Sequence, residues 1–548
     1  MKRKSRILLP AALLIMASGS LLLVFLHLYL PGMISGRVER EISIILDSGS
    51  GGLFTVQVDK PRLSIFPWNI SFPRISLQPD QTALTRTALE SLPSKLYKAE
   101  ITDLQTSLRS LIKAGTGTSG RAGDWIYAGN ISLTVFENQG GIEHKNLNGE
   151  AQTGIRLHSA VIDNIELEQR YMDDGQGMVV MAANIEFNEN RVKANGRNNL
   201  HAHEPGTLRA GGSQIFPGGS LHEFKADSIF INLDAGTINI YSPRMIPLHG
   251  KPDYHNYLEF QTERIEARFD SITAMGFNID NTGKEPVFSL ATITLDGGKI
   301  DVFRDRRPPF DEQQRPQMPS RLIGNASAGF YIGNIGINGT EIIYSEFPQD
   351  ADPSEFDEAT GRVNFSDLNA GISNVTNLAD SLVNDSIMRI TASAEIFDAA
   401  LLSAEFRYNL RDINGGYTAR GTLEEMEFRK INTALYPLAG IKVEGGLHHG
   451  SEFNFAGNDY RSEGELYMSW SDLLLELAPE AGEFAGEVAR FAGKTFLYRP
   501  SGGRNNDDAS AGEIYFERDN TRFVFHYWWN CYLTGILDNV LRDLVPYP

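Results

Sequence analysis

The chain has 548 residues, of which 41% are hydrophobic, 10% aromatic and 22% charged. This composition is typical of a folded protein, and the length exceeds what one ordinary hydrophobic core organises, so we expect several domains or one elongated repetitive body. The 69 acidic and 50 basic residues give a net charge of −19, which excludes nucleic acid as an expected partner because such a surface repels phosphate backbones. The single cysteine, Cys531, excludes an intramolecular disulfide and a zinc-cysteine cluster.

An uncharged apolar run occupies residues 7–30. At about 1.5 Å per residue, a helix of this length crosses a hydrocarbon core of roughly 30 Å. Four basic residues within 1–6 precede it, and such clusters usually stay cytoplasmic. The alternative is a cleaved signal peptide, whose apolar region is usually only about 7–15 residues long and ends at a small-residue cleavage site. We therefore predict a cytoplasmic tail at 1–6, a single-pass inner-membrane anchor at 7–30, and a periplasmic location for the rest.

The body of the chain has the pattern of a mainly β protein with some helices, an α+β fold. Residues 33–47 have apolar residues at helical spacing, and a helical hairpin is predicted between Thr82 and Ala114. Alternation of apolar and polar residues then recurs to about residue 470 and predicts strands. We expect an elongated, curved antiparallel β-sheet or groove, with its strands at 125–137, 161–171, 181–189, 228–241 and 264–277, among others.

Three of these segments change the phase of their apolar alternation at a glycine. A change of phase would turn the second half of a straight strand to the wrong face, so each glycine marks either a bulge or a tight turn. Both interpretations give a meandering sheet with one apolar face, which either is covered or lines an open groove. The candidate residues of this apolar groove are Ile229, Ile231, Leu233, Ile293, Leu295, Ile300 and Val302.

The segment 305–320 is rich in proline, charge and glutamine and predicts an exposed loop at a subdomain boundary. It separates an N-terminal periplasmic β-rich region, 31–304, from a second β region, 321–520. Residues 521–548 predict a C-terminal amphipathic helix, because apolar residues recur there at three- and four-residue intervals. This helix either closes the core or lies at a membrane interface or groove, and its candidate face consists of Trp529, Leu533, Ile536 and Val540.

Signatures of catalysis are missing from the sequence. It contains no Gly-rich phosphate loop, nucleophile elbow or His-Glu-x-x-His motif. The adjacent His448 and His449 would point to opposite faces of a strand, and Cys531 lies among apolar residues as a small buried side chain does. We therefore name no catalytic, cofactor-binding or metal-binding residue, and we expect a protein that is not an enzyme.

The last third of the chain resembles the C-terminal region of AsmA-like proteins. The resemblance rests on Gly416 and Gly421 framing a strand, Ile431-Asn432 opening a helix that ends near Leu438, and Gly445-Gly446 in the next hairpin. The segment 332–347 and the N-terminal anchor are similar to other parts of the same group. The resemblance implies an inner-membrane helix, a periplasmic body of repeated antiparallel strands, and a role in outer-membrane assembly or in conducting phospholipid between membranes.

Three functions are therefore open. The first is handling or transfer of phospholipid or another acyl lipid between inner and outer membranes through a hydrophobic β-groove, with the inner membrane and outer-membrane assembly proteins as partners. The second is a structural or scaffold protein of the cell envelope with a closed β core. The third, an envelope glycan hydrolase, is supported only by the abundant acidic side chains and requires two carboxylates that face each other across a cleft.

Overall fold

The computed structural model describes eleven stretches of the chain, namely residues 32–40, 53–65, 68–80, 95–107, 125–137, 159–171, 177–189, 206–280, 286–477, 496–502 and 510–541. The chain divides into two compact units, Met1–Asp234 and Ala235–Pro548, here called unit 1 and unit 2. The predicted loop 305–320 therefore lies within unit 2. The predicted anchor at 7–30 lies outside the described residues, and within those residues no helix combines the length and the apolar character needed to cross a membrane.

Unit 1 contains a helix at 32–40 and a set of neighbouring β-strands. The helix overlaps the one predicted at 33–47. Most neighbouring strands pair antiparallel, but β5 and β6 are parallel. The strands are β1 (Phe54–Val58), β2 (Arg62–Ile65), β3 (Trp68–Pro79), β4 (Lys95–Ser107), β5 (Ile126–Glu137), β6 (Ser159–Tyr171), β7 (Val179–Glu189), β8 (Gly206–Phe216) and β9 (His222–Asn232).

The helical hairpin predicted between Thr82 and Ala114 is wrong, because residues 95–107 form strand β4, which pairs with β3 and β5. The backbone of β4 is kinked at Asp103, whose φ is 52°. This kink separates the apolar Ile101 and Leu104 by three positions instead of two. Three-residue spacing is typical of a helix, and it produced the wrong prediction.

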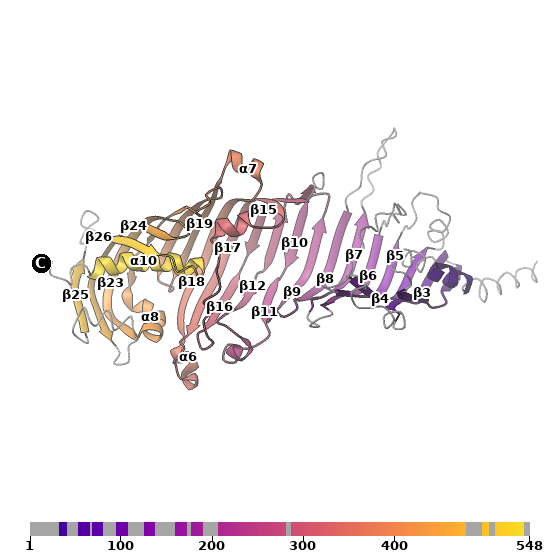
Figure 1. The fold of residues 1–548 in the computed structure, drawn as a ribbon, viewed down its shortest axis with the longest axis horizontal. Helices are drawn as coiled ribbons and strands as arrows, with labels where there is room; N and C mark the ends of the chain where they lie inside the picture. The colour runs from indigo at the N-terminus through magenta and orange to yellow at the C-terminus, as the bar shows by residue number, and fades with distance from the viewer. Residues whose placement is uncertain are drawn as a thin grey trace, which may run out of the picture. The chain divides into compact units, whose positions relative to one another are not determined.

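The strands of unit 2 form a mixed, largely antiparallel sheet (Figure 1). Its strands are β10 (Thr237–Tyr241), β11 (Arg244–Pro247), β12 (Glu263–Arg268), β13 (Ser271–Met275), β14 (Asn278–Asp280), β15 (Val287–Asp296), β16 (Lys299–Asp305), β17 (Gly329–Phe347), β18 (Gly361–Thr376), β19 (Ile387–Ile396), β20 (Ala400–Asn409), β21 (Tyr417–Leu423), β22 (Met426–Glu427), β23 (Ile441–Gly457), β24 (Arg461–Leu477), β25 (Phe496–Gly502) and β26 (Ser510–Glu517). The mainly β fold is thus confirmed.

The largely antiparallel pairing that the sequence predicts is confirmed, and the exception in unit 2 is β17, which runs parallel to both β15 and β16. β15 and β16 follow each other along one line of the sheet. The connection 306–328 returns the chain to the beginning of β15 before β17 starts. A return of this kind makes the next strand parallel, whereas a short hairpin would make it antiparallel.

Short helices and one longer helix complete unit 2. They are η3 (Tyr254–Tyr257), α5 (Pro319–Gly324), η4 (Pro353–Glu355), α6 (Phe356–Ala359), α7 (Ala379–Asn384), η5 (Phe428–Ile431), α8 (Asn432–Ala439) and α10 (Val524–Leu541). The predicted C-terminal helix is confirmed as α10, which crosses in front of the orange and yellow strands in Figure 1 and packs on β24 and β26. The main core lies between this helix and the sheet, and it includes Tyr408, Phe455, Leu466, Trp470 and Cys531.

The glycine phase changes have two structural explanations. Residues 233–236 form a tight turn, in which Gly236 has a φ of 60°. The other two changes are kinks inside strands: β15 and β16 are two halves of one line, interrupted at Gly297-Gly298, and both halves keep the same register with β17. Opposite this interruption, β17 itself is irregular at Gly339.

The kinks of neighbouring strands lie side by side and are joined by hydrogen bonds. We call this the kink row of unit 2. The N–H of Ser242 donates to the carbonyl of Asp270 at 2.9 Å, and the N–H of Asp270 to that of Asp296 at 3.0 Å. Further along, the N–H of Gly339 donates to Asn369 Oδ1 at 3.1 Å. Four members of the row have left-handed φ values of 48–63°, namely Ser242, Gly297, Gly339 and Asp367.

Two glycines allow α10 to lie directly on the sheet. A Cβ atom added to Gly512 in β26 would meet the carbonyl oxygen of Gly535 at 2.1 Å, and one added to Gly535 would meet the Leu466 Cβ at 2.7 Å. Neither a backbone carbonyl nor a Cβ atom can move away as the end of a flexible side chain can. The position of α10 therefore depends on the absence of side chains at these two residues.

We predict that Gly512→Ala destabilises unit 2 by about 1–3 kcal/mol, because the added methyl group overpacks the contact between helix and sheet. Thermal melting followed by tryptophan fluorescence measures the effect. The matched control is Gly336→Ala, also within a strand, where the nearest atom to the added Cβ is 4.0 Å away. Equal melting temperatures for the two variants would contradict this account of the contact.

Candidate functional site

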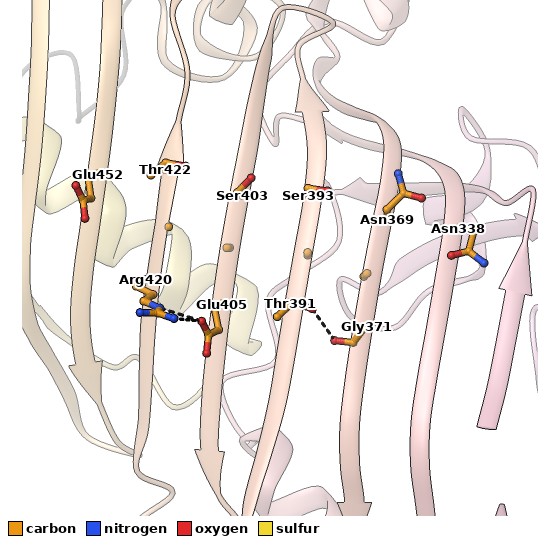
Figure 2. A pocket seen from close by; sticks show the side chains of 14 residues that line it. Asn338, Asn369, Gly371, Thr391, Ser393, Ser403, Glu405, Arg420, Thr422 and Glu452 are labelled. Carbon is orange, nitrogen blue, oxygen red and sulfur yellow. Dashed lines mark hydrogen bonds and ion pairs between the residues drawn. The ribbon is translucent and has the colours of Figure 1, made fainter. Parts of the chain in front are cut away.

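The two faces of the sheet in unit 2 differ in chemistry. On one face, a shallow hollow of about 590 Å³ is lined by small and polar side chains from neighbouring strands, including Asn369, Thr391, Ser403 and Glu452. Figure 2 shows these side chains on the near side of the strands, with the pale yellow C-terminal helix behind them. The opposite face, on which α10 lies, is apolar.

Two carboxylates line this hollow, Glu405 and Glu452, and Glu405 is held as an anion. Glu405 accepts hydrogen bonds from Arg420, at 2.9 Å from its Nε, and from Arg407. These donors lower the pKa of Glu405 below its usual value. A glycosidase needs a carboxyl group whose pKa is raised so that it can donate a proton. Glu405 therefore has the character of a structural ion pair.

On the apolar face, side chains form rows that cross the strands. Residues directly opposite each other on paired strands share a face, so the register defines these rows. One row contains Ile238, Ala274, Ile293, Ile335, Ile372, Ile390, Phe406, Ala419 and Phe455. A second contains Ile240, Ile272, Leu295, Ile337, Ala370, Ala392 and Ala404.

The apolar face continues on both sides of the kink row. Ile372 packs with the main core, and Phe365, on the other side of the Asp367 kink, packs with a second cluster that includes Tyr532 of α10. Their partners on β17 are Ile335 and Ile342. Ile335 and Ile342, in the two halves of β17, therefore lie on the same face of the sheet. Further along the sheet, α10 covers this face.

This register places four of the predicted groove residues together. Ile293 and Leu295 lie beside Ile335 and Ile337, while Ile300 and Val302 lie beside Ile342 and Tyr344. All four are half-buried. We call the half-buried residues of this region the isoleucine face; they are Ile238, Ile240, Ile265, Ile272, Ile293, Leu295, Ile300, Val302, Ile335, Ile337 and Ile342.

The other three predicted groove residues belong to unit 1. Ile229 and Ile231 lie in β9 opposite Ala210 and Leu208, whereas Leu233 lies in the turn after β9 and is 46% exposed. Unit 1 has apolar rows of its own. One of them contains Val56, Leu77, Ala99, Leu133, Leu167, Val180, Ile215 and Phe224.

The buried stripe of α10 differs from the predicted face. Tyr527, Cys531, Gly535 and Asn539 face the sheet and are buried, whereas Trp529 is 51% exposed. Of the predicted face, Leu533 and Ile536 are half-buried, and the side chain of Val540 lies outside the described residues. The sequence pattern missed this stripe because Gly535 and Asn539 are not apolar.

Buried polar groups fix the helix on the sheet. Asn539 Nδ2 donates to the Leu466 carbonyl at 2.8 Å, and the hydroxyls of Tyr532 and Ser451 share a hydrogen bond of 2.8 Å. Burial raises the pKa of the Cys531 thiol to about 11, so this side chain stays protonated and is a poor nucleophile at neutral pH.

The two histidines singled out in the sequence do lie on opposite faces of β23. His448 is buried and His449 is exposed, and burial lowers the pKa of His448. Among the residues that the structure describes, no group of three or more His, Cys, Asp or Glu side chains is arranged to hold a metal ion. Comparison with known proteins finds no matching protein family and no matching curated protein.

Truncation after Asn520 removes α10 and exposes the core that it covers. We predict that the truncated chain loses the cooperative melting transition of unit 2, measured by near-UV circular dichroism, because several large buried side chains become exposed to water. The matched control is Trp529→Ser, which changes an exposed position on the same helix and should melt like the wild type. Unchanged melting of the truncated chain would show that α10 is not part of the core.

Proposed function

We propose that this protein handles acyl lipid on the isoleucine face of unit 2, as a membrane-anchored protein of the cell envelope that does not perform covalent chemistry. The proposal rests on one observation: the burial of the apolar rows decreases along the sheet with distance from α10. The rows are buried beneath α10 at one end, where Ala419 and Phe455 belong to the core, and continue into isoleucines that are only half-buried. The lipid would occupy this less covered part.

The physical basis is the cost of exposing hydrocarbon to water. Each methylene group kept out of water contributes about 0.8 kcal/mol, so a row of branched side chains several strands wide can hold an acyl chain without a single polar contact. Contiguous apolar surface is unusual on soluble proteins and typically marks a binding site. The kink row keeps these side chains on one face, which is what a continuous apolar track requires.

The wider role follows from the sequence. The predicted anchor at 7–30 would hold the body on the periplasmic side of the inner membrane, and the resemblance to AsmA-like proteins favours lipid transfer between inner and outer membranes or support of outer-membrane assembly. These assignments, including phospholipid as cargo, are part of the proposal. The half-buried rows support it because a transferred acyl chain needs access from solvent or from a membrane.

The second candidate is a scaffold protein with a closed core. It is favoured by the complete burial of Leu466 and of Cys531 beneath α10, where no ligand is needed to fill the space. The two functions make different demands on the isoleucine face. A scaffold requires the isoleucines only for packing, whereas a lipid carrier requires them to contact lipid.

Site-specific photo-crosslinking separates the two candidates. We predict that a photoreactive amino acid at Ile337 of the full chain crosslinks to lipid in membranes, because Ile337 belongs to the isoleucine face. The control is the same substitution at Asn334 on the same strand, which is exposed and lies opposite Ser373 on the polar face. Crosslinking to lipid at neither position, or equally at both, would contradict the proposed function.

A further inference from the structure

A second cleft, of about 700 Å³, lies beside the β23–β24 hairpin turn of unit 2 and is separate from the polar hollow of Figure 2. Its walls come from residues 315–318, α5, the hairpin turn and residues 517–520. Four arginines line it, namely Arg315, Arg321, Arg461 and Arg518, together with two acidic residues, Asp459 and Glu517. The lining thus has an excess of positive charge in a chain whose net charge is −19.

Two of the arginines are fixed by one carboxylate. Asp459 accepts a hydrogen bond from Arg518 Nη1 at 3.1 Å and another from Arg321 Nε at 3.0 Å. Arg518 Nη2 also donates to the Pro316 carbonyl at 2.6 Å. The Arg518 side chain is only 4% exposed, so this guanidinium is held in place before any ligand binds.

Most of the arginine donors have acceptors within the protein: Arg461 pairs with Glu463 at 2.9 Å, and Arg315 donates to the carbonyls of Glu312 and Gln314 at 2.6 Å. One buried donor does not. Arg518 Nε is buried and has no hydrogen-bond partner. Arginine guanidinium groups present several N–H donors in a planar fork, which matches the oxygens of phosphate and carboxylate groups. Several such forks around one cleft indicate a ligand that carries more than one anionic oxygen.

The cleft also borders the apolar core. Met318 lines the cleft and is fully buried in the core cluster beneath α10. The core therefore reaches the wall of the cleft at Met318, but this side chain is fully buried and exposes no apolar surface there.

We propose that this arginine cleft binds a phosphate-bearing anion. The anion is either inorganic phosphate or the phosphate of a lipid headgroup, and the assignment to a lipid rests on the proposed function. The phosphate oxygens accept hydrogen bonds from Arg321, Arg461 and Arg518, while Asp459 positions two of these guanidinium groups.

Isothermal titration of the full chain in a non-ionic detergent tests the site with two probes, inorganic phosphate and dihexanoyl phosphatidic acid. We expect Arg321→Gln and Arg461→Gln each to weaken binding about tenfold, because each removes charge-assisted hydrogen bonds. Arg461 is 59% exposed, so its replacement does not threaten folding. The matched control is Arg389→Gln: Arg389 is 42% exposed and pairs with Asp385 at 3.0 Å, much as Arg321 is 40% exposed and pairs with Asp459 at 3.0 Å.

The two probes distinguish the source of the phosphate. Arginine-dependent binding of phosphatidic acid alone supports a lipid headgroup, and arginine-dependent binding of inorganic phosphate alone supports an anion site and overturns the lipid assignment. Binding of neither probe, or binding that Arg321→Gln and Arg461→Gln leave at the level of the Arg389→Gln control, overturns the site itself. Lipid crosslinking at Ile337 is independent of these arginines, so a failure of the cleft and a failure of the proposed function give different results.

Discussion

The structure of unit 2 depends on one geometric constraint, the alternation of side chains along a β-strand. A single irregular residue changes the phase of side-chain alternation along a strand, and the apolar face stays continuous only where a bulge or a matching kink in the neighbouring strand compensates. The kink row meets this constraint, since Ser242, Gly297, Gly339 and Asp367 all adopt a left-handed φ and hydrogen bonds join their strands. The kinks therefore preserve a single apolar face instead of interrupting it.

The extent to which α10 covers this face determines what each part of the face can do. At the end near β26, Gly512 and Gly535 let α10 approach the backbone of the sheet. The core side chains between the helix and the sheet are buried there. Further along, at β10, β13, β15 and β17, the isoleucines and Leu295 of the same rows are half-buried. The closed part supplies stability that an open surface alone would lack, and the half-buried part remains accessible to a hydrocarbon ligand.

Much of this was accessible from the sequence, because alternation and glycine positions are local signals. They predicted the β fold, the C-terminal helix and a shared apolar surface. Of the residues predicted for this surface, Ile293, Leu295, Ile300 and Val302 lie together in unit 2, whereas Ile229, Ile231 and Leu233 belong to unit 1. The hairpin predicted at 82–114 failed because a kink at Asp103 produces helix-like spacing, and the buried stripe of α10 was missed because Gly535 and Asn539 do not look like core residues. The arginine cleft had no local signal at all, since Arg321, Asp459 and Arg518 are brought together only by the fold.

The central claim is that the isoleucine face holds acyl lipid, and analysis of the lipids that copurify with the full chain tests it most directly. Mass spectrometry of the detergent-purified wild type should find bound acyl lipid, and Leu295→Asp should reduce the bound amount strongly, because a carboxylate placed in the apolar row opposes contact with hydrocarbon. Thr294→Asp, at the neighbouring position on the opposite face of β15, should retain the wild-type amount. Absence of lipid from the wild type, or equal amounts in the two variants, would contradict the account.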